Sequence, residues 1–247
     1  MALPSFLKPK KNYLLNRFGR NNDGGYLVSQ KTVLEAKTLV SFGILDDTSF
    51  ELDFLNTNQI PNLCYDHSIN KSYWKKRFFN DFGSAVYKLN WKILLNTFQR
   101  YLESKSFFKL TNIDLYIETV KEGCIRNIFN RNDLNKPIFF KIDIEGAEYR
   151  VLDELIEFQD LICGLVIEFH DIDLHIQKIH NFIKSFNLEL THIHPNNFGQ
   201  KDKNGDPIVI ELTFEKSPIE INKSLSMPNI FDQPNNPAAK DIDLKFI

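Results

Sequence analysis

The sequence is poor in cysteine and contains no long apolar run. Cys64, Cys124 and Cys163 lie far apart, form no CxxC pair and have no fixed spacing to histidine. This pattern argues against a disulfide framework and a structural zinc site, and it favours a reducing environment. No apolar run approaches the ~20 residues of a membrane-spanning helix. Residues 1–11 contain two prolines and soon turn basic, unlike a signal peptide. We therefore expect a cytoplasmic protein.

The sequence also lacks an excess of charge of either sign. Its 247 residues include 30 basic and 32 acidic side chains, for a formal net charge of −2. This balance produces no overall field for binding nucleic acid or an anionic membrane, so an anionic partner must be bound locally. The length allows one domain to bury its own core, and we interpret residues 1–247 as a single domain. Four prolines after residue 216 predict an irregular tail over residues 217–247, which could wrap the domain or bridge subunits of a homo-oligomer.

Apolar segments alternate with segments of helical periodicity along most of the chain. Strands are expected over residues 38–44, 63–65, 113–117, 138–144 and 164–169. Helices are expected from residue 50 and over residues 119–129, 147–158 and 173–186. This alternation predicts a mostly parallel sheet covered by helices on both faces. The last two strands, over residues 188–194 and 208–214, are joined by a turn-rich loop and predict an antiparallel hairpin.

Residues 71–109 differ in composition from the rest of the chain. This segment contains nine lysines and arginines but only two acidic residues, Asp81 and Glu103, which gives a local charge of +7. Both tryptophans, Trp74 and Trp91, also lie here. Apolar residues recur at helical spacing, so we predict a helical insertion with aromatic and basic faces. Such faces could bind the phosphates of an anionic ligand and stack on its base or sugar. They could equally form a solvated cap or a dimer surface, and so modest a basic footprint does not favour nucleic acid.

Polar side chains follow several predicted strands at their carboxyl ends, where open parallel sheets bind ligands. Gly43, Asp46 and Asp47 follow the first strand, and Asp66 follows the second. An acidic residue about 20 positions after a glycine turn is typical of a site for a ribose diol, because a carboxylate can accept hydrogen bonds from both hydroxyls. The GxGxxG fingerprint of NAD and FAD sites is absent. Gly43 and Asp66 therefore favour a nucleoside that lacks a pyrophosphate.

The most unusual segment is the central strand. Lys141, Asp143 and Glu145 alternate with apolar residues and share one face of a strand that should be buried. Unpaired buried charge is costly, so these groups must pair with each other, lie in a solvated cleft or bind a ligand. Glu168 and His170 share a face of the following strand. If the two strands are neighbours, Asp143, Glu168 and His170 could hold a divalent cation, or His170 could act as a general base.

Two further motifs carry less information. Gly24 and Gly25 precede a short apolar segment that begins at Tyr26, a pattern that is often only a tight turn. His192 and His194 lie on one face of a predicted strand, and no third ligand supports a zinc site there. We interpret the two histidines as substrate contacts or as a cap on the strand end.

Together these segments resemble the FkbM family of S-adenosylmethionine-dependent methyltransferases, in order and spacing, over roughly residues 17–215. The similar segments are 20–28, 41–54, 65–67, 141–148, 167–170 and 192–197. The most specific is 141–148, Lys-Ile-Asp-Ile-Glu-Gly-Ala-Glu. The resemblance implies an α/β, Rossmann-like methyltransferase fold.

The resemblance also implies where S-adenosylmethionine would bind. Gly43 would back the methionine portion, Asp66 would hold the ribose, and Asp143 and Glu145 would lie beside the reacting methyl group. The implied cofactor contacts are Gly24, Gly25, Tyr26, Ser41, Phe42, Gly43, Ile44, Asp47, Ser49, Asp66, His67 and Asp143. The sequence departs from the family in its first motif, where a glycine-rich loop is reduced to Gly43.

The family commonly methylates oxygen on sugars and related natural products, which implies a sugar hydroxyl as acceptor. The basic insertion favours a nucleotide-activated or phosphorylated sugar, as in surface polysaccharide biosynthesis. A hydroxyl is a poor nucleophile at neutral pH, so the site needs a base or a metal. The candidate bases are Asp143, Glu145 and His170, followed by His67 and His194.

Two other hypotheses follow from the same residues. An acidic cluster also suits water activation by a metal, so a metal-dependent hydrolase could use Asp143, Glu145, Glu168 and His170. The depleted glycine loop also allows a Rossmann-like binding module without catalytic activity.

Overall fold

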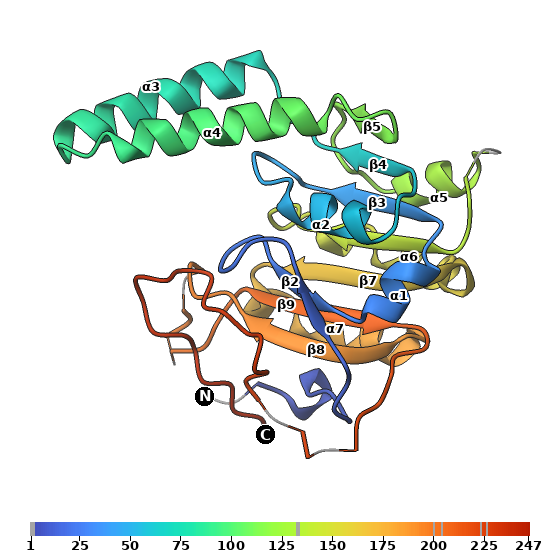
Figure 1. Ribbon diagram of the computed structural model, residues 1–247. Coiled ribbons are helices and arrows are strands. Elements are labelled where there is room, and N and C mark those ends of the chain that lie inside the picture. Colours follow the sequence, from blue (N-terminus) through green and yellow to red (C-terminus); the bar gives the residue numbers. More distant parts are fainter. Residues whose placement is uncertain (1–2, 132–133, 200, 204, 223, 226) are drawn as a thin grey trace.

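A seven-stranded sheet forms the centre of the molecule (Figure 1). The computed structural model describes residues 3–131, 134–199, 201–203, 205–222, 224–225 and 227–247. The strands of this sheet are β3 (Thr38–Phe42), β4 (Asn62–Tyr65), β5 (Ile113–Tyr116), β6 (Ile138–Ile142), β7 (Ile162–Phe169), β8 (Glu189–Pro195) and β9 (Ile210–Glu215). Their order is β5-β4-β3-β6-β7-β9-β8. Neighbours from β5 to β7 are parallel, whereas β9 runs antiparallel to both β7 and β8.

This topology confirms the predicted Rossmann-like α/β fold with its C-terminal antiparallel hairpin. The position of β9, between β7 and β8, was not part of the prediction. Every residue of β9 is buried, whereas β8 begins with an exposed residue. The polar side chains of β9 have partners that suit an inner strand: Glu215 accepts hydrogen bonds from the Ser29 amide (2.8 Å) and the Thr32 hydroxyl (2.6 Å).

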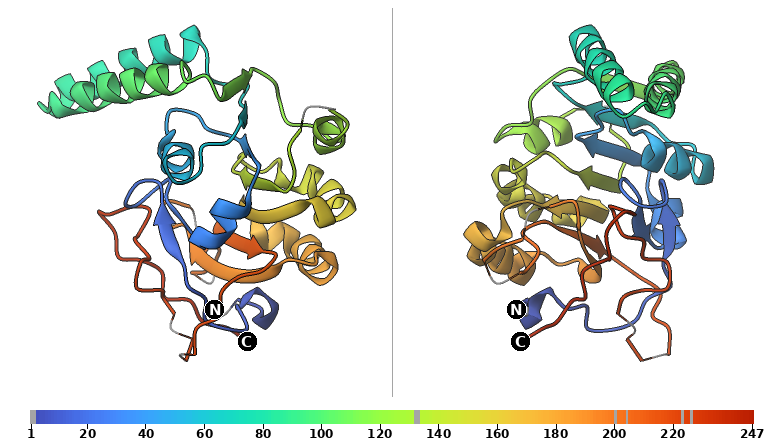
Figure 2. Two further views of the ribbon diagram at one scale, coloured as in Figure 1. Left: turned by 45° about the vertical axis from the view of Figure 1, so that its right-hand side comes forward. Right: turned by 90° about the vertical axis from the view of Figure 1, so that its left-hand side faces the viewer.

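Helices cover both faces of the sheet (Figure 2). One face packs against α1 (Gln30–Glu35) and α2 (Ser49–Thr57), and the other against α5 (Cys124–Phe129), α6 (Leu152–Glu157) and α7 (Ile172–Ser185). Successive residues of a strand point to opposite faces, so Phe139 joins the core under α2 and Phe140 joins the core under α5 and α6. The inner strands β3 and β6 are buried at every residue, as expected for parallel strands between two helical layers.

Short elements complete the chain. The 3-10 helices are η1 (Ser5–Leu7), η2 (Glu148–Arg150) and η3 (Gln159–Leu161), and β1 (Asn16–Phe18) pairs antiparallel with β2 (Tyr26–Val28). The helix expected over residues 119–129 begins only at Cys124, because Gly123 precedes it in the left-handed region with φ +85°. The helix expected over residues 147–158 is divided into η2 and α6.

The predicted helical insertion is an antiparallel hairpin of α3 (Lys71–Tyr87) and α4 (Lys92–Phe107), which projects beyond the sheet in both figures. The Asn70 side chain caps α3 by accepting a hydrogen bond from the Tyr73 amide (2.9 Å). The described residues of the two helices include only a few buried ones: Ala85, Thr97, Ser104 and Phe107.

The C-terminal segment after β9 runs back along the edge of the sheet. Bridges join Leu3 to Phe246 and Tyr13 to Glu220, so this segment lies beside the N-terminal one. The first described residues and the last ones therefore lie close together, as Figures 1 and 2 show. Within the described part of the chain, no helix combines the length and the apolar character needed to cross a membrane.

Candidate active site

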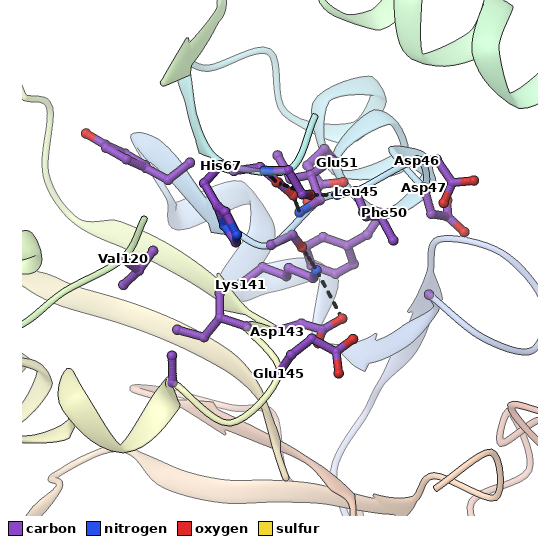
Figure 3. A pocket seen from close by; sticks show the side chains of 18 of the residues that line it. Leu45, Asp46, Asp47, Phe50, Glu51, His67, Val120, Lys141, Asp143 and Glu145 are labelled. Atoms are coloured by element: carbon purple, nitrogen blue, oxygen red, sulfur yellow. Dashed lines mark hydrogen bonds and ion pairs between the residues drawn. The ribbon is translucent and has the colours of Figure 1, made fainter. Parts of the chain in front are cut away.

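A pocket of about 390 Å³ opens at the carboxyl ends of β3, β4 and β6 (Figure 3). It is lined by Asp23, Gly24, Tyr26, Gly43, Ile44, Leu45, Asp46, Asp47, Phe50, Glu51, Tyr65, Asp66, His67, Ser68, Arg100, Glu118, Thr119, Val120, Lys141, Asp143, Ile144, Glu145 and Ala147. This is the sheet edge at which ligands collect in open parallel sheets. Carboxylates outnumber cationic side chains in this lining, so the pocket is suited to a ligand that carries positive charge or many hydroxyl donors.

The turn after β3 requires glycine at its first position. Gly43 has φ +73°, and a Cβ atom there would lie 1.6 Å from the backbone oxygen of Asp143. The Gly43 amide donates to the Tyr65 oxygen (3.0 Å), and the Asp143 amide donates to the Phe42 oxygen (2.9 Å). Three adjacent strand ends are therefore tied together at the pocket floor, and any side chain at this turn would separate them.

Asp66 organises the same turn from the end of β4. One carboxylate oxygen accepts from the Ile44 amide (2.9 Å) and the Leu45 amide (2.7 Å). The other accepts from the Ser68 amide (2.6 Å), the Ser68 hydroxyl (2.5 Å) and the Ile69 amide (3.3 Å). Burial favours the protonated acid, but these hydrogen bonds outweigh it and lower the pKa of Asp66. The group is therefore an ionised carboxylate that shapes the wall of the pocket.

Lys141 is the cation at the pocket floor. Its ammonium group donates to the Gly43 oxygen and lies 3.6 Å from an Asp143 carboxylate oxygen. Burial lowers the pKa of Lys141, but the charges of Asp143 and Glu51 outweigh burial and raise it. Glu51, at the start of α2, is also fully buried, and burial raises its pKa. Of the three alternatives expected for these charges, pairing is present between Lys141 and Asp143, and both side chains also line the pocket. Glu51 is a further acid beside them.

The base of the hairpin is attached to the loop after β3. Asp46, which is 5% exposed, pairs with Arg77 of α3 (3.1 Å) and Arg100 of α4 (3.4 Å). Arg20 bridges the same region, with Asp47 at 3.2 Å and Glu103 at 2.7 Å. The hairpin therefore contributes to the pocket wall at its base, whereas its far end does not reach the pocket.

A second group of polar side chains adjoins the pocket at the ends of β6 and β7. The Nδ1 atom of His170 lies 2.7 Å from an oxygen of Glu148, which is fully buried and also accepts from the Gly146 amide (3.0 Å). The Nε2 atom of His170 lies 3.5 Å from Glu145 and 3.7 Å from Glu168. Burial lowers the pKa of His170, but the hydrogen bond and charge of Glu148 outweigh burial and raise it.

The group also includes Asp143. Asp143, Glu168 and His170 can each offer a ligand atom, and these atoms lie within 4.8 Å of one another. Glu168 is buried and accepts a hydrogen bond from the Asn196 amide group (2.8 Å). Burial, followed by the charges of Asp143 and Glu211, raises the pKa of Glu168 well above its ordinary value. The spacing would allow a divalent cation, whose charge would relieve this repulsion.

The structure brings most of the expected cofactor residues to one pocket. Those that line it are Gly24, Tyr26, Gly43, Ile44, Asp47, Asp66, His67 and Asp143. The lining does not include Gly25, Ser41, Phe42 and Ser49. Ser41 and Phe42 are fully buried in β3, Ser49 accepts a hydrogen bond from the Arg20 amide (3.0 Å), and Gly25 packs against the Arg20 backbone. Of the candidate catalytic residues, Asp143 and Glu145 line the pocket and His170 lies next to them.

The two histidines of β8 have other partners. His192 lies 2.8 Å from Asp232, and His194 lies 3.1 Å from Asp241 and 3.4 Å from Glu211. Burial lowers the pKa of His194, but the hydrogen bonds of Asp241 and Glu211 outweigh burial and raise it to about 10. These histidines therefore attach the C-terminal segment to the sheet.

Several residues of the site were not singled out from the sequence. Glu118, Thr119 and Val120 line the pocket, and they follow β5 as an irregular segment rather than a helix. Their position directly after a predicted strand could have indicated that they lie at the edge of the sheet where the pocket forms. Glu148 is the last residue of the family-like segment 141–148, but nothing in the local sequence says that its side chain turns toward His170.

The family model described as the methyltransferase FkbM domain matches residues 3–196. None of the curated proteins matches the sequence.

Solved structures also match the chain. One is precorrin-6y C5,15-methyltransferase from Geobacter metallireducens, with 11% identity, a TM-score of 0.40, and coverage of 76% of this chain and 85% of that one. Another, described as a putative sarcosine dimethylglycine methyltransferase from Galdieria sulphuraria, has 9% identity and a TM-score of 0.40, and covers 76% of this chain and 81% of its own.

Proposed function

We propose that this chain, which belongs to the family of methyltransferase FkbM domains, transfers a methyl group from S-adenosylmethionine to a hydroxyl oxygen of a sugar. The proposal rests on one observation: the acidic pocket and the polar group around His170 are adjacent. The acidic pocket at the ends of β3, β4 and β6 shares Asp143 and Glu145 with the group around His170. A pocket that suits the cofactor therefore adjoins a candidate base.

The chemistry of the pocket fits S-adenosylmethionine. That cofactor carries a positive sulfonium and an ammonium group, and when bound it supplies an electrophilic methyl group. Asp47 and Asp143 provide negative charge in the lining. The turn at Gly43 and the segment at Asp66 and His67 would hold the methionine portion and the ribose. Because the Asp66 oxygens already accept backbone hydrogen bonds, a ribose hydroxyl at Asp66 would share or replace the bond from Ser68.

His170 is the residue best placed to remove the acceptor proton. When Nδ1 carries the hydrogen and donates it to Glu148, the lone pair of Nε2 faces Glu145 and Glu168. A buried carboxylate on Nδ1 fixes this tautomer and stabilises the imidazolium that forms when the base accepts a proton. Asp143 and Glu145 would accept hydrogen bonds from the acceptor hydroxyls and hold the reacting oxygen in place.

The lining also supports a polyhydroxylated acceptor. Clustered carboxylates bind hydroxyl donors well and repel phosphate, so the reacting end of the acceptor is a neutral sugar ring. Arg100 also lines the pocket, where it pairs with Asp46, and it supports a nucleotide or phosphate group at the far end of the acceptor. A nucleotide-activated or phosphorylated sugar of surface polysaccharide biosynthesis has this arrangement.

The metal-dependent alternatives rest on one specific observation, the spacing of Asp143, Glu168 and His170. A divalent cation there would activate the acceptor hydroxyl, or water in a hydrolase. Chelation separates these possibilities. Methyl transfer that survives EDTA excludes a required metal and leaves the proton to a side chain such as His170. Hydrolysis that needs a metal and ignores S-adenosylmethionine supports the hydrolase. Binding of the cofactor without turnover supports the non-catalytic module.

The first test is thermal unfolding with S-adenosylhomocysteine, using NADH and Mg²⁺ as parallel additions. A ligand at about a hundred times its dissociation constant stabilises by roughly 2.7 kcal/mol, or about 5 to 10 °C for a domain of this size. We expect that shift with S-adenosylhomocysteine alone. Transfer of labelled methyl from S-adenosylmethionine to a panel of sugar nucleotides then identifies the acceptor. A shift with Mg²⁺ and none with S-adenosylhomocysteine would remove the basis of this proposal.

A further inference from the structure

The hairpin of α3 and α4 exposes an apolar face. It consists of Phe79, Phe82 and Val86 on α3 and Leu95, Phe98 and Leu102 on α4, which we call the hairpin face. Between 47% and 78% of each of these residues is exposed. On each helix the three residues follow i, i+3, i+7 spacing, so they form one stripe.

The two stripes lie on the same side of the hairpin. The helices face each other through Phe78 and Tyr101, whose rings are 6.0 Å apart, and through the hydrogen bond from Thr97 to Asp81 (2.5 Å). On each helix, a residue of the hairpin face comes directly after a residue that contacts the other helix. Phe82 comes after Asp81 on α3, and Phe98 comes after Thr97 on α4. Because antiparallel helices have the same hand, an equal offset turns both stripes to the same side. The two helices therefore present one continuous apolar surface.

The hairpin face points away from the pocket. Arg77 and Arg100, which pair with Asp46 below the hairpin, each precede an inward aromatic residue by one position. They therefore lie on the opposite side of the hairpin from the apolar stripes. Figures 1 and 2 show the hairpin projecting beyond the sheet, so no other described element covers its far end. An occupant of this face would leave the pocket free.

The residues around the hairpin face indicate the nature of its partner. Exposed lysines occur along both helices and at the tip: Lys71, Lys75, Lys76, Lys88, Lys92, Lys105 and Lys109. At the tip, Tyr87, Leu89 and Trp91 are 88%, 86% and 58% exposed, beside Lys88 and Lys92. Apolar side chains enter the acyl boundary of a bilayer, tryptophan and tyrosine prefer its interface, and lysine binds anionic head groups.

We propose that the hairpin face docks this protein on the surface of an anionic lipid bilayer, with α3 and α4 lying in the plane of the interface. The basic charge of the hairpin favours an anionic lipid surface over a second copy of this chain. Residues 71–109, which include the hairpin, carry a local charge of +7, so a second copy packed face to face would bring two like-charged surfaces together. A lipid surface supplies both negative charge and an apolar layer. The pocket would remain open while the protein is bound to the membrane.

The test is sedimentation of the full chain with vesicles of two compositions. One is pure phosphatidylcholine, and the other is phosphatidylcholine with one third phosphatidylglycerol. We expect the protein to bind the anionic vesicles, to bind the neutral ones far more weakly, and to lose affinity as salt rises above about 0.15 M. Both tryptophans lie in the hairpin, so their emission should shift to the blue when anionic vesicles are added.

Matched variants separate the apolar and the charged contributions. F79S with L95S removes two exposed apolar side chains and should weaken vesicle binding by about tenfold or more. K88Q with K92Q should weaken it by about thirtyfold at low salt. The control is L174S with K184Q on α7, where Leu174 is 74% exposed, and it should bind like the parent. Circular dichroism of each variant checks that it folds.

Three experimental results would overturn the proposal that the hairpin face binds a lipid surface. One is an absence of binding and of any emission shift with the parent protein, a result that needs no variant. Another is unchanged vesicle binding by both folded hairpin variants. A third is a dimer, detected by analytical ultracentrifugation, that F79S with L95S abolishes while the parent ignores vesicles. That third result would assign the hairpin face to a contact between two copies. None of these outcomes depends on methyl transfer.

Discussion

A buried oxygen of Glu148 lies 2.7 Å from Nδ1 of His170. This contact distinguishes His170 from an ordinary surface histidine, because it fixes the ring so that Nε2 faces Glu145 at the border of the pocket. The backbone oxygen of His170 also accepts a hydrogen bond from the Tyr149 hydroxyl (2.6 Å), which holds the end of β7 in place. The ring is therefore held in one orientation before any acceptor binds.

Replacement of His170 should abolish most of the methyl transfer. A positioned base contributes roughly 10² to 10⁴-fold, so we expect H170Q to lower kcat by about a hundredfold or more. Binding of S-adenosylhomocysteine should stay close to that of the parent, because His170 does not line the pocket proposed for the cofactor. Single-turnover methyl transfer and calorimetric titration measure the two effects. Nearly normal kcat in H170Q would show that another group takes the proton.

The pH profile should report the same residue. The pKa of His170 is raised above its ordinary value of 6.5, and the neutral form is the base. Activity should therefore rise with pH through a pKa above 6.5 and then level off. E148Q removes the charge that raises this pKa, so its acid limb should lie at lower pH while kcat falls. An acid limb at the same pH in E148Q and the parent would contradict the assignment.

Gly43 should tolerate no side chain. In G43A the new Cβ would lie 1.6 Å from the Asp143 oxygen at φ +73°, so we expect a loss of about 3 kcal/mol or more in the free energy of unfolding. Gly123 is a matched control, because it has φ +85° with nothing within 4 Å of its Cβ position. G123A should cost about 1 to 2 kcal/mol. Urea unfolding compares the two variants, and equal losses would mean that strain in φ alone accounts for both.

Asp66 should stabilise the turn whether or not it contacts a ribose. An asparagine offers one acceptor oxygen in place of two, so D66N leaves backbone amides such as those of Ile44 or Ser68 without a partner. We expect a loss of about 1 to 3 kcal/mol, together with weaker binding of S-adenosylhomocysteine. Because the pKa of Asp66 is lowered by folding, its contribution is present above the ordinary value of 3.8 and fades as pH falls through the folded value. Parent-like stability in D66N at pH 7 would show that the turn does not need the carboxylate.

His194 should make attachment of the C-terminal segment dependent on pH. Its pKa is raised to about 10 in the folded protein, so the stabilisation from its charged form is fully present below 6.5 and is lost as pH rises through about 10. The difference in unfolding free energy between the parent and H194Q should therefore be largest at acidic pH and shrink toward pH 10. Limited proteolysis beside Asp241 should become faster over the same range. A difference that stays constant with pH would exclude a charged histidine.

The local sequence predicted the main elements because their signals act over short distances. A run such as that of β6 is apolar at nearly every position, which is typical of a strand between two helical layers. The glycine turn at Gly43 and the charges of Lys141 and Asp143 were visible for the same reason, since glycine and buried charge are both costly unless the fold requires them. The resemblance to the FkbM family came from those same residues, and the match over residues 3–196 confirmed it.

The sequence predicted a helix boundary wrongly where the tertiary structure overrides a local pattern. Residues 119–129 have helical periodicity, yet the helix starts at Cys124 after the left-handed Gly123. The segment before it is therefore irregular, and Glu118 and Thr119 from it line the pocket. Periodicity describes which residues share a face, but it does not say where the backbone leaves the helix.

The sequence by itself determined the family, the alternation of strands and helices, and the edge of the sheet at which polar residues gather, because each depends on neighbours within one or two elements. Only the tertiary structure decided the partners of groups that lie far apart in the chain. It placed β9 between β7 and β8, joined Asp46 to Arg77 and Arg100, and paired His194 with Asp241. Such pairs depend on how whole helices and strands pack, because packing decides which charged groups lie close to each other. A buried charge needs a partner, and any arrangement that provides one is stabilised. No local spacing records that choice.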